Sequence, residues 1–333
     1  MRFLLASVVS LLASVCWSQH PYVAYHRNYG AKANNATDIG PAIKSAFTNC
    51  IIKNPNSRLG NYLLSSTVLL NAGSNWAFQL DGLITVDYSA YISGAVAGNA
   101  FVFPRMNNFE LYSSNGQGAI DECVSVKSPS KQATIENIRC NQSGGSSIGS
   151  LKDGSVIESI LFQNIENYQV TNAFMLKTYP GGASPGYVKN VVLRNFTNID
   201  VTYNAYITQY WQNSYALGAS NVQLSNMTFS GWRGSVNHGG NRGAVVMIGS
   251  ETNPPVNINV KNFSFWTVNG NSVVDRCSST YGSGSCIKAL PAKGSPTKYA
   301  TVYVTATAAP AGWVTPKAPW GIPPYGEELA LTD

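Results

Sequence analysis

Charged residues are scarce in this sequence of 333 residues. Lys and Arg number 22 and Asp and Glu 16, so that 11% of the chain is charged, under half of the roughly 25% usual for a soluble domain. Together with a hydrophobic fraction of 44%, this excludes a disordered chain and a charged coiled coil. Asn, Ser, Thr and Gly replace the charge, and with Val, Ile and Tyr they favour strands and tight turns. An all-β fold is therefore expected.

Three further features that the sequence lacks argue against nucleic-acid binding, a membrane span and a metal site. The basic residues form no run, so the formal net charge of +6 indicates no nucleic-acid partner, although it would tolerate an acidic polymer. Beyond the N-terminus no stretch is long and apolar enough to span a membrane. The histidines at positions 20, 26 and 238 are scattered and no Cys-x-x-Cys pair occurs, so no metal site is expected.

The first residues have the form of a secretory signal peptide. Met1-Arg2 is followed by an apolar run from Phe3 to Val15 and then by the small residue Ser18. A membrane anchor needs roughly 18 to 20 apolar residues, and this run is shorter. The sequence therefore predicts that residues 1–18 are removed and that the mature protein is secreted to the extracellular space.

Secretion places the cysteines in an oxidising environment, where disulfides form. Cys277 and Cys286 bracket a turn-rich segment and are expected to close a local loop. Cys123 and Cys140, which are 17 residues apart, are expected to join neighbouring strands. Five cysteines remain after the predicted signal peptide, so Cys50 is left unpaired.

A repeated pattern runs through the second half of the chain, in which β-branched or apolar residues are followed by an Asn and another apolar residue. The Asn residues in register are Asn164, Asn195, Asn226 and Asn262, at spacings of 31, 31 and 36, and the segment ending at Asn141 lies 23 before Asn164. Strand repeats of this period indicate a solenoid or a propeller. A propeller needs recurrent hairpin turns, which are missing, so the variable spacing favours a parallel β-helix whose loops absorb insertions.

Equivalent residues of successive coils lie above one another in a β-helix. The register Asn residues are therefore expected to form an inward-facing hydrogen-bonded ladder at a bend with left-handed backbone, which Asn tolerates. An inward-facing Asn cannot carry a glycan. Glycosylation motifs begin at Asn35, Asn141, Asn195, Asn226 and Asn262, and Asn35 is predicted to be the main site, with the other four used in part at most.

Both ends of the solenoid have features that would close it. Asp38 can cap a short helix that runs to about Cys50 and has apolar residues at every fourth position, and such a helix would cover the first coil. The β-helix domain is expected to span residues 19–312. Residues 313–333, which are rich in proline, are expected to form an extended tail.

Short motifs are distributed from about Tyr29 to Trp313, nearly the whole mature chain. They include Tyr29-Gly30-Ala31-Lys32, Asp121-Glu122-Cys123-Val124-Ser125-Val126-Lys127-Ser128-Pro129, Ser143-Gly144-Gly145 and Tyr281-Gly282-Ser283-Gly284. These motifs resemble those of the fungal rhamnogalacturonases, pectin-degrading glycoside hydrolases of family 28. The resemblance implies a right-handed parallel β-helix, a monomer that needs no cofactor, and inverting hydrolysis of the galacturonate-rhamnose backbone of rhamnogalacturonan.

The same resemblance assigns the catalytic pair. Asp121 is the expected general acid and Glu122 the expected base. An inverting glycosidase needs one protonated carboxyl group and one carboxylate, roughly 6.5 to 9.5 Å apart. Because adjacent residues of a strand point to opposite faces, the strand must end or bulge here for both to face the substrate.

Three residues are expected to bind the polysaccharide. Lys177 matches the position at which the superfamily has a lysine that binds the substrate carboxylate, and Lys127 belongs to the motif that contains the acid pair. A surface position is the alternative for each lysine. Tyr210, together with Trp211, offers a flat apolar ring on which a sugar could stack, and core packing is the alternative.

The chain departs from the family between Glu110 and Asp121. Rhamnogalacturonases have further coils there, with a third catalytic carboxylate, whereas this sequence has no Asp or Glu in between. The cysteine expected to pair with Cys50 is missing as well. The gap has two explanations, a shortened gene model of an active enzyme or a degenerate family member. Two functions are consequently compatible with the sequence, a pectin hydrolase that is impaired to some degree and a non-catalytic β-helix that binds rhamnogalacturonan or polygalacturonan. A pectate lyase is disfavoured because no carboxylate cluster for calcium is present.

Overall fold

The computed structural model describes residues 22–23, 29–32, 34, 36–50, 61–70, 76–79, 83–96, 101–112, 119–120, 123–213, 220–237, 243–267, 270, 272–291, 298–305, 308–309 and 311–314. The predicted signal peptide, Asn35, Asp121, Glu122 and most of the predicted tail lie outside the described residues. So does the side chain of Cys50.

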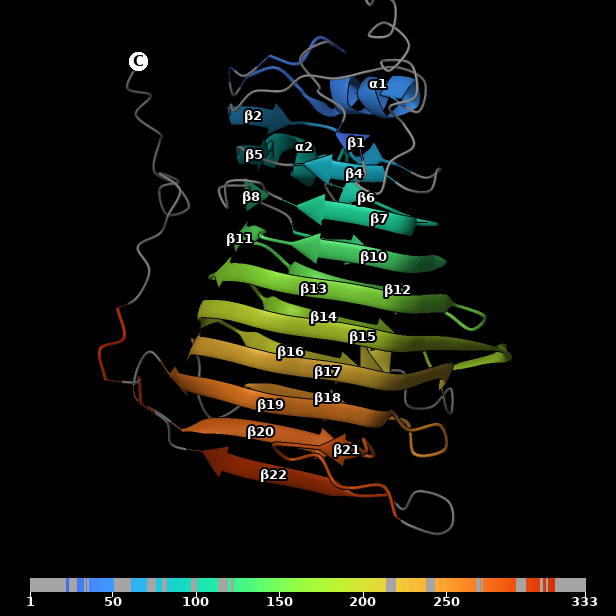
Figure 1. Cartoon of the computed structure of the whole chain (residues 1–333), viewed down its shortest axis with the longest axis vertical. Helices are drawn as coiled ribbons and strands as arrows, with labels where there is room; N and C mark the ends of the chain where they lie inside the picture. The colour runs from blue at the N-terminus through green and yellow to red at the C-terminus, as the bar shows by residue number, and fades with distance from the viewer. Residues whose placement is uncertain are drawn as a thin grey trace, which may run out of the picture.

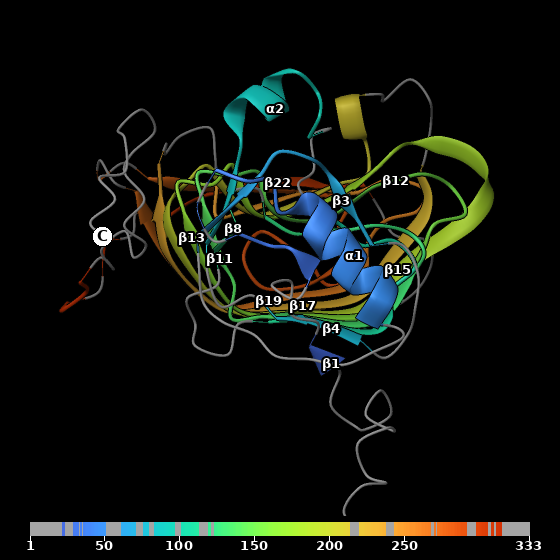
Figure 2. The same cartoon turned by 90° about the horizontal axis from the view of Figure 1, so that it is seen from above.

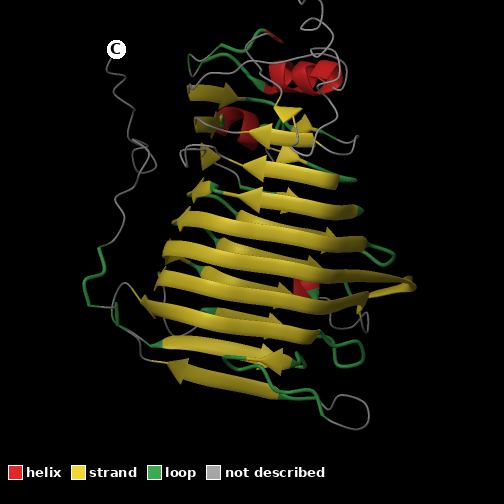
Figure 3. Cartoon of the chain, in the orientation of Figure 1, coloured by secondary structure: helices red, strands yellow, loops and turns green. Residues whose placement is uncertain are grey.

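Stacked strands make up most of the described chain, and helices are short (Figure 1, Figure 3). The helical elements are α1 Gly40–Cys50, α2 Tyr88–Ile92 and the 3-10 helix η2 Trp211–Asn213. The strands before the middle of the chain are β1 Tyr22–Val23, β2 Asn61–Leu64, β3 Val68–Leu69, β4 Trp76–Gln79, β5 Leu83–Val86, β6 Phe101–Val102, β7 Asn107–Tyr112, β8 Ala119–Ile120, β9 Ser125–Val126, β10 Ser130–Glu136, β11 Arg139–Asn141 and β12 Gly145–Leu151. Those that follow are β13 Val156–Tyr168, β14 Asn172–Thr178, β15 Gly181–Val201, β16 Tyr203–Thr208, β17 Ser220–Val236, β18 Val245–Ile248, β19 Val256–Thr267, β20 Val273–Ser278, β21 Gly282–Ser283 and β22 Ala300–Thr305.

The strands form a right-handed parallel β-helix, as predicted. One sheet has 13 strands and bends around two sides of the coil, because β13, β15, β17 and β19 each cross from one side to the next. The remaining side is a seven-stranded sheet in the order β22-β20-β18-β16-β14-β12-β9. A bridge between Phe103 and Val126 continues this side towards β6. Figure 2 looks down the coil and shows the sheets enclosing a common interior.

The long strands bend where single residues adopt left-handed backbone. β15, β17 and β19 each contain a pair of such bends five residues apart, which in β15 are at Asn190 (φ 59°) and Asn195 (φ 57°), and β15 has a further left-handed residue at Asp200 (φ 55°). The paired bends therefore form two columns along the solenoid. Asn is frequent in both columns because its short polar side chain tolerates this conformation.

The predicted Asn ladder exists, but its register was wrong at Asn226. Asn195 Nδ2 donates to Asn164 Oδ1 (2.6 Å), whereas Asn226 Nδ2 donates to Asn190 Oδ1 (2.6 Å). Strand pairing accordingly places Gly231 opposite Asn195. The prediction failed because both bends of a coil carry the same local pattern, so that spacing alone could not assign Asn226 to one column or the other. Likewise Asn137, not Asn141, bonds to Asn164 (2.9 Å).

The ladder also lies on the outer surface, which corrects the expectation that it faces inward. Asn195, Asn226 and Asn262 are exposed. The interior is taken by the apolar residues that alternate with them, such as Val191 and Leu193, both 0% exposed. A left-handed residue points its side chain away from a convex bend, so the polar amides meet solvent and each other.

Aromatic rings fill the interior along the solenoid. Phe196, Trp232 and Phe263 occupy equivalent positions of three coils and stack at centroid distances of 4.0 and 5.2 Å. Trp232 is fully buried, and its indole N–H donates to the carbonyl oxygen of Leu193 (3.1 Å). This stack joins successive coils through apolar burial, which is the main stabilising term in such a fold.

The ends of the described solenoid are closed in different ways. At the N-terminal end α1 lies across the first coil, with Ile39 and Ile43 buried, and Asp38 Oδ1 accepts the N–H of Gly40 (2.9 Å). The capping helix was therefore predicted correctly. At the other end β22 pairs with β20 in antiparallel orientation. Among the described residues no helix meets the length and apolar character needed to cross a membrane.

Candidate functional site

The outer face of the seven-stranded sheet brings together two of the predicted binding residues. Val126, Ile148 and Leu176 are in register and point into the core. The next residue of each strand points outward, which aligns Lys127, Gly149 and Lys177 along the solenoid axis. We call these three residues the lysine column. The two lysines are 50 positions apart in the sequence but are separated by one coil in space.

Gly149 holds the middle of the lysine column together. Its carbonyl oxygen accepts hydrogen bonds from Lys127 Nζ and from Ser125 Oγ (3.3 Å). Its φ is 123°, and a Cβ here would lie 2.4 Å from the carbonyl oxygen of Lys177. A residue without a side chain is thus required where the two lysines flank the backbone. Gly149 and Ser125 could not be recognised as site residues from the sequence, because their roles depend on the stacking of coils.

Both lysines are half-buried, and their electrostatics follow from that position. Burial lowers the pKa of Lys127, and repulsion from the Lys177 ammonium lowers it further. Burial also lowers the pKa of Lys177. An anion placed between the two ammonium groups would relieve both effects, so the lysine column has the electrostatics of a carboxylate-binding site.

An aromatic side chain covers Lys177. The centroid of the Trp211 ring lies 4.3 Å from Lys177 Nζ, a cation–π contact. Figure 2 shows η2, drawn in yellow, on the outer side of the seven-stranded sheet, the side on which α2 also lies. Trp211 was predicted as a ring for sugar stacking, but its position over Lys177 could not be predicted because the two residues lie on different coils.

Buried hydrogen bonds fix the segment that carries Trp211. The fully buried amide of Gln209 donates to the carbonyl oxygen of Val222 (2.9 Å) and accepts the N–H of Ser250 (2.7 Å). The hydroxyl of Tyr210 accepts the N–H of Glu251 (3.4 Å). Tyr210 is half-buried and directly precedes Trp211 in the chain.

The predicted acid pair lies between β8 and β9, outside the described residues. Its C-terminal neighbour Cys123 forms a disulfide with Cys140 on β11, with a Cα–Cα distance of 5.6 Å. This bond joins adjacent coils and anchors the chain next to Glu122. The second disulfide, Cys277–Cys286, closes a loop near the C-terminal end (Cα–Cα 5.4 Å).

The described glycosylation motifs differ in accessibility. Asn141 is 5% exposed, whereas Asn195, Asn226 and Asn262 lie on the surface. The amides of Asn195 and Asn226 donate within the ladder. Use of any of these motifs stays a prediction.

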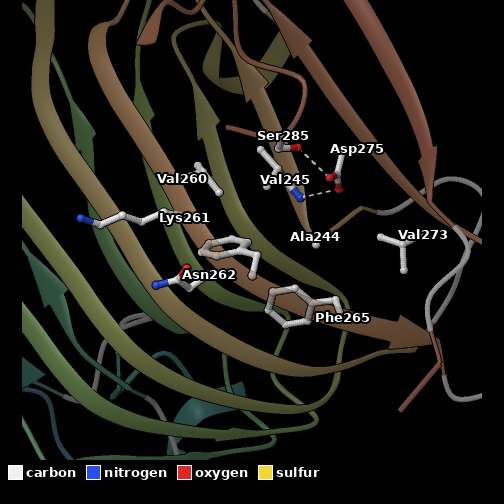
Figure 4. A pocket seen from close by; sticks show the side chains of 10 residues that line it. Ala244, Val245, Val260, Lys261, Asn262, Phe265, Val273, Asp275 and Ser285 are labelled. Atoms are coloured by element: carbon white, nitrogen blue, oxygen red, sulfur yellow. Dashed lines mark hydrogen bonds between the residues drawn. The ribbon is translucent and has the colours of Figure 1, made fainter. Parts of the chain in front are cut away.

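A cavity of about 290 Å³ lies near the last coils, away from the lysine column (Figure 4). It is mostly apolar, but Asp275 points into it, accepting hydrogen bonds from Ser285 Oγ (2.7 Å) and from the N–H of Val245 (2.9 Å). Burial raises the pKa of Asp275, although these bonds oppose the rise. Within the described residues no group of three or more His, Cys, Asp or Glu side chains could hold a metal ion.

Comparison with known proteins identifies the family. The model of glycosyl hydrolases family 28 matches residues 112–286. A probable rhamnogalacturonase B of Neosartorya fischeri is 30% identical, over 88% of this chain and 71% of that protein. Rhamnogalacturonase A of Aspergillus aculeatus is 29% identical, over 86% and 81% of the two chains.

Among solved structures, an endo-xylogalacturonan hydrolase from Aspergillus tubingensis is similar over 75% of this chain and 94% of that one, with 17% identity and a TM-score of 0.36. The family match spans more than half of the sequence and includes the lysine column and both disulfides. The chain belongs to family 28 of the glycosyl hydrolases.

Proposed function

We propose that this protein is a secreted, extracellular glycoside hydrolase that cleaves the galacturonate-rhamnose backbone of pectin. The observation that carries the proposal is the lysine column, in which two half-buried ammonium groups flank Gly149 on one outer face of the solenoid. Its charge suits the carboxylates of galacturonate. The relatives named rhamnogalacturonase support this substrate over an unrelated acidic polymer.

Asp121 and Glu122 perform the chemistry in this proposal. Asp121 donates its proton to the glycosidic oxygen as the bond to the sugar breaks, and Glu122 removes a proton from the attacking water. Water attacks the anomeric carbon on the face opposite the leaving group, so the configuration inverts. Two adjacent carboxyl groups favour this division of roles, because repulsion between their charges raises one pKa. The Cys123–Cys140 disulfide supports the proposal because it fixes Cys123, the residue that follows the pair, to β11.

Lys127, Lys177 and Tyr210 bind the substrate. The lysines neutralise the uronate carboxylate, and the half-buried ring of Tyr210 contacts a sugar face. Trp211 holds the Lys177 ammonium by its cation–π contact. The proposed enzyme acts as a monomer and needs no cofactor.

A second candidate function is non-catalytic pectin binding. The alignment with the Neosartorya fischeri protein runs over 382 positions, more than the 333 residues of this chain, so that protein has segments with no counterpart here. Between Glu110 and Asp121 the chain has no carboxylate. Loss of one member of a cooperating catalytic set lowers rates by orders of magnitude.

Release of reducing ends from rhamnogalacturonan and from polygalacturonan distinguishes the two functions. The hydrolase proposal expects turnover of rhamnogalacturonan that Asp121→Asn abolishes, and a product whose first-formed anomer, observed by NMR, is inverted. Lys261→Gln, an exposed substitution on β19, serves as the control. A folded protein that binds the polymer without releasing reducing ends would instead establish the non-catalytic function.

A further inference from the structure

A second cavity lies beside the lysine column, at the ends of β12 and β14. Its volume is about 400 Å³, within the range of small-ligand sites. It is lined by two turns from adjacent coils, formed by Lys152 and Asp153 and by Tyr179, Pro180, Gly181 and Gly182. β15 begins within the second turn, at Gly181, and the first part of this strand projects from the side of the solenoid in both views (Figure 1, Figure 2).

Hydrogen bonds hold the two turns rigidly together. Asp153 Oδ2 accepts the N–H groups of Ala183 and Ser184, both at 3.2 Å. The N–H of Gly154 donates to the carbonyl oxygen of Ser184 (2.9 Å). The cavity is therefore formed before any ligand arrives, which lowers the entropy lost on binding.

Gly182 allows the turns to approach so closely. Its φ is 94°, and a Cβ there would lie 2.4 Å from the Cβ of Asp153. The amide of Asn221, on the following coil, donates to the carbonyl oxygen of Gly182. The wall of the cavity is thus fixed from both neighbouring coils.

The lining has the chemistry of a site for a neutral sugar. Tyr179 is half-buried and offers a ring face for the apolar side of a sugar, as aromatic rings commonly do in binding sites. Lys152 is exposed and can donate to a hydroxyl group. No described residue donates to Asp153 Oδ1, which can accept from a sugar hydroxyl. One ammonium and one carboxylate give no net charge, in contrast to the two cations of the lysine column.

The cavity lies to the side of the lysine column rather than in line with it. Lys127 and Lys177 are aligned along the solenoid axis, whereas Tyr179 lies two residues beyond Lys177 across that axis, a displacement of roughly 7 Å at the rise of a strand. A polysaccharide backbone bound along the lysine column would therefore pass the mouth of the cavity. Only a unit attached to the side of the backbone could enter it.

We propose that this cavity binds a neutral sugar carried as a branch on the acidic backbone, with Tyr179, Lys152 and Asp153 as its contacts. The inference rests on the proposed function, because it assumes that the backbone lies along the lysine column. The site makes the protein prefer a branched substrate over a linear one.

The test compares a linear backbone oligosaccharide with the same oligosaccharide carrying one neutral sugar branch. Affinity is measured by calorimetry and kcat/KM by reducing ends, for the wild type, Tyr179→Ala, Tyr179→Phe and Lys152→Gln, with Lys261→Gln as the matched surface control. Tyr179→Ala is expected to lower the wild-type preference for the branched fragment about tenfold. Tyr179→Phe should restore most of it, since the ring face is kept.

Each result has a distinct meaning. The cavity does not bind a branch if the wild type has equal affinity for both fragments, or if Tyr179→Ala leaves the preference for the branched fragment unchanged. In either case, binding and cleavage of the linear fragment still test whether the backbone lies along the lysine column. If the linear fragment is neither bound nor cleaved and the branched one is bound, the proposed function fails and the cavity stands as a sugar site. Binding of neither fragment refutes both.

Discussion

At the scale of single residues, the most informative feature is the pair of lysines in the lysine column, one held by a backbone carbonyl and the other by an aromatic ring. Lys127 bonds to Gly149 while Lys177 lies under Trp211. These contacts keep two like charges close together without a neighbouring carboxylate among the described residues. Such an arrangement is unfavourable in the free protein and becomes favourable when an anion binds.

The substitution Lys177→Met tests directly whether the lysine column binds an acidic oligosaccharide. Removing one charge-assisted contact is expected to weaken binding of an acidic oligosaccharide at least about tenfold, the effect of losing roughly 1.5 kcal/mol or more. Calorimetric titration measures the affinity, and Lys261→Met provides the surface control. An affinity equal to that of the wild type would mean that the polymer binds elsewhere.

The same substitution has a consequence for pH dependence. Repulsion from Lys177 contributes to the lowered pKa of Lys127, so Lys177→Met is expected to raise the pKa of Lys127. Carboxylate binding needs the protonated lysine, and binding by the variant should therefore persist to higher pH than in the wild type, although it is weaker overall. Affinity measured from pH 7 to pH 10 gives both profiles. A midpoint that does not move, or moves down, would contradict the coupling.

The ionisation of Asp275 makes the stability of the protein depend on pH. Burial raises its pKa in the folded state, so its stabilising contribution is complete below the unfolded pKa and is lost as the pH rises through the raised folded pKa. Asp275→Asn should remove this loss because the amide stays neutral and can still accept from Val245. At pH 7 the melting temperature is expected to rise by roughly 2–4 °C, the effect of about 1 kcal/mol in a large domain, with little change at pH 3. A variant that melts lower at pH 7 would contradict this.

At the scale of elements, the bends of the long strands decide how the coil turns. Each bend needs a residue that adopts positive φ, and the Asn side chains then bond to the coil above or below. The bends therefore combine a local conformational requirement with a contact between coils. This explains why Asn recurs at these positions while β-branched residues occupy the straight parts of the strands.

The substitutions Asn195→Val and Asn195→Gly separate the conformational requirement of the bend from the hydrogen bond between coils. Valine at φ 57° is expected to destabilise the protein by about 1–2 kcal/mol or more, because the left-handed conformation is unfavourable for it. Glycine keeps the conformation and loses only the bond to Asn164, so its effect should be smaller. Urea unfolding monitored by circular dichroism measures both. Equal stability of the two variants would show that the bend has no conformational role.

The elements also show what the sequence could and could not predict. The helix after Asp38 and the solenoid follow from local capping, periodicity and strand repeats, so they were predictable. The coil register at Asn226 was not, because two bends five residues apart carry the same pattern. The contact between Lys177 and Trp211 could not be predicted from the sequence either, because it depends on how far each coil is shifted against the next. Resemblance to a family identified Lys127 and Lys177, but only the stacking of coils gives Gly149 its role.

At the scale of the whole molecule, the protein is a series of coils in which each coil contacts mainly its neighbours. In this part of the chain each long strand pairs only with the corresponding strand of the coil before or after it, in the order β10·β13, β13·β15, β15·β17 and β17·β19. Stability in such a fold is approximately a sum of contributions from coils and their interfaces. A local defect is consequently expected to stay local.

The N-terminal helix is the place to examine this property. Ile43 is 3% exposed and packs on the first coil, so Ile43→Asp would place a charge in an apolar interface and open that end. Hydrogen exchange should accelerate in α1, β2 and β5, while β13, β15 and β17 stay protected as in the wild type. Lys44→Asp adds the same side chain at the neighbouring exposed position and should leave both regions unchanged. Faster exchange in β15 and β17 of the Ile43→Asp variant would mean that the solenoid unfolds as one unit, and that the face carrying the lysine column depends on the distant cap for its integrity.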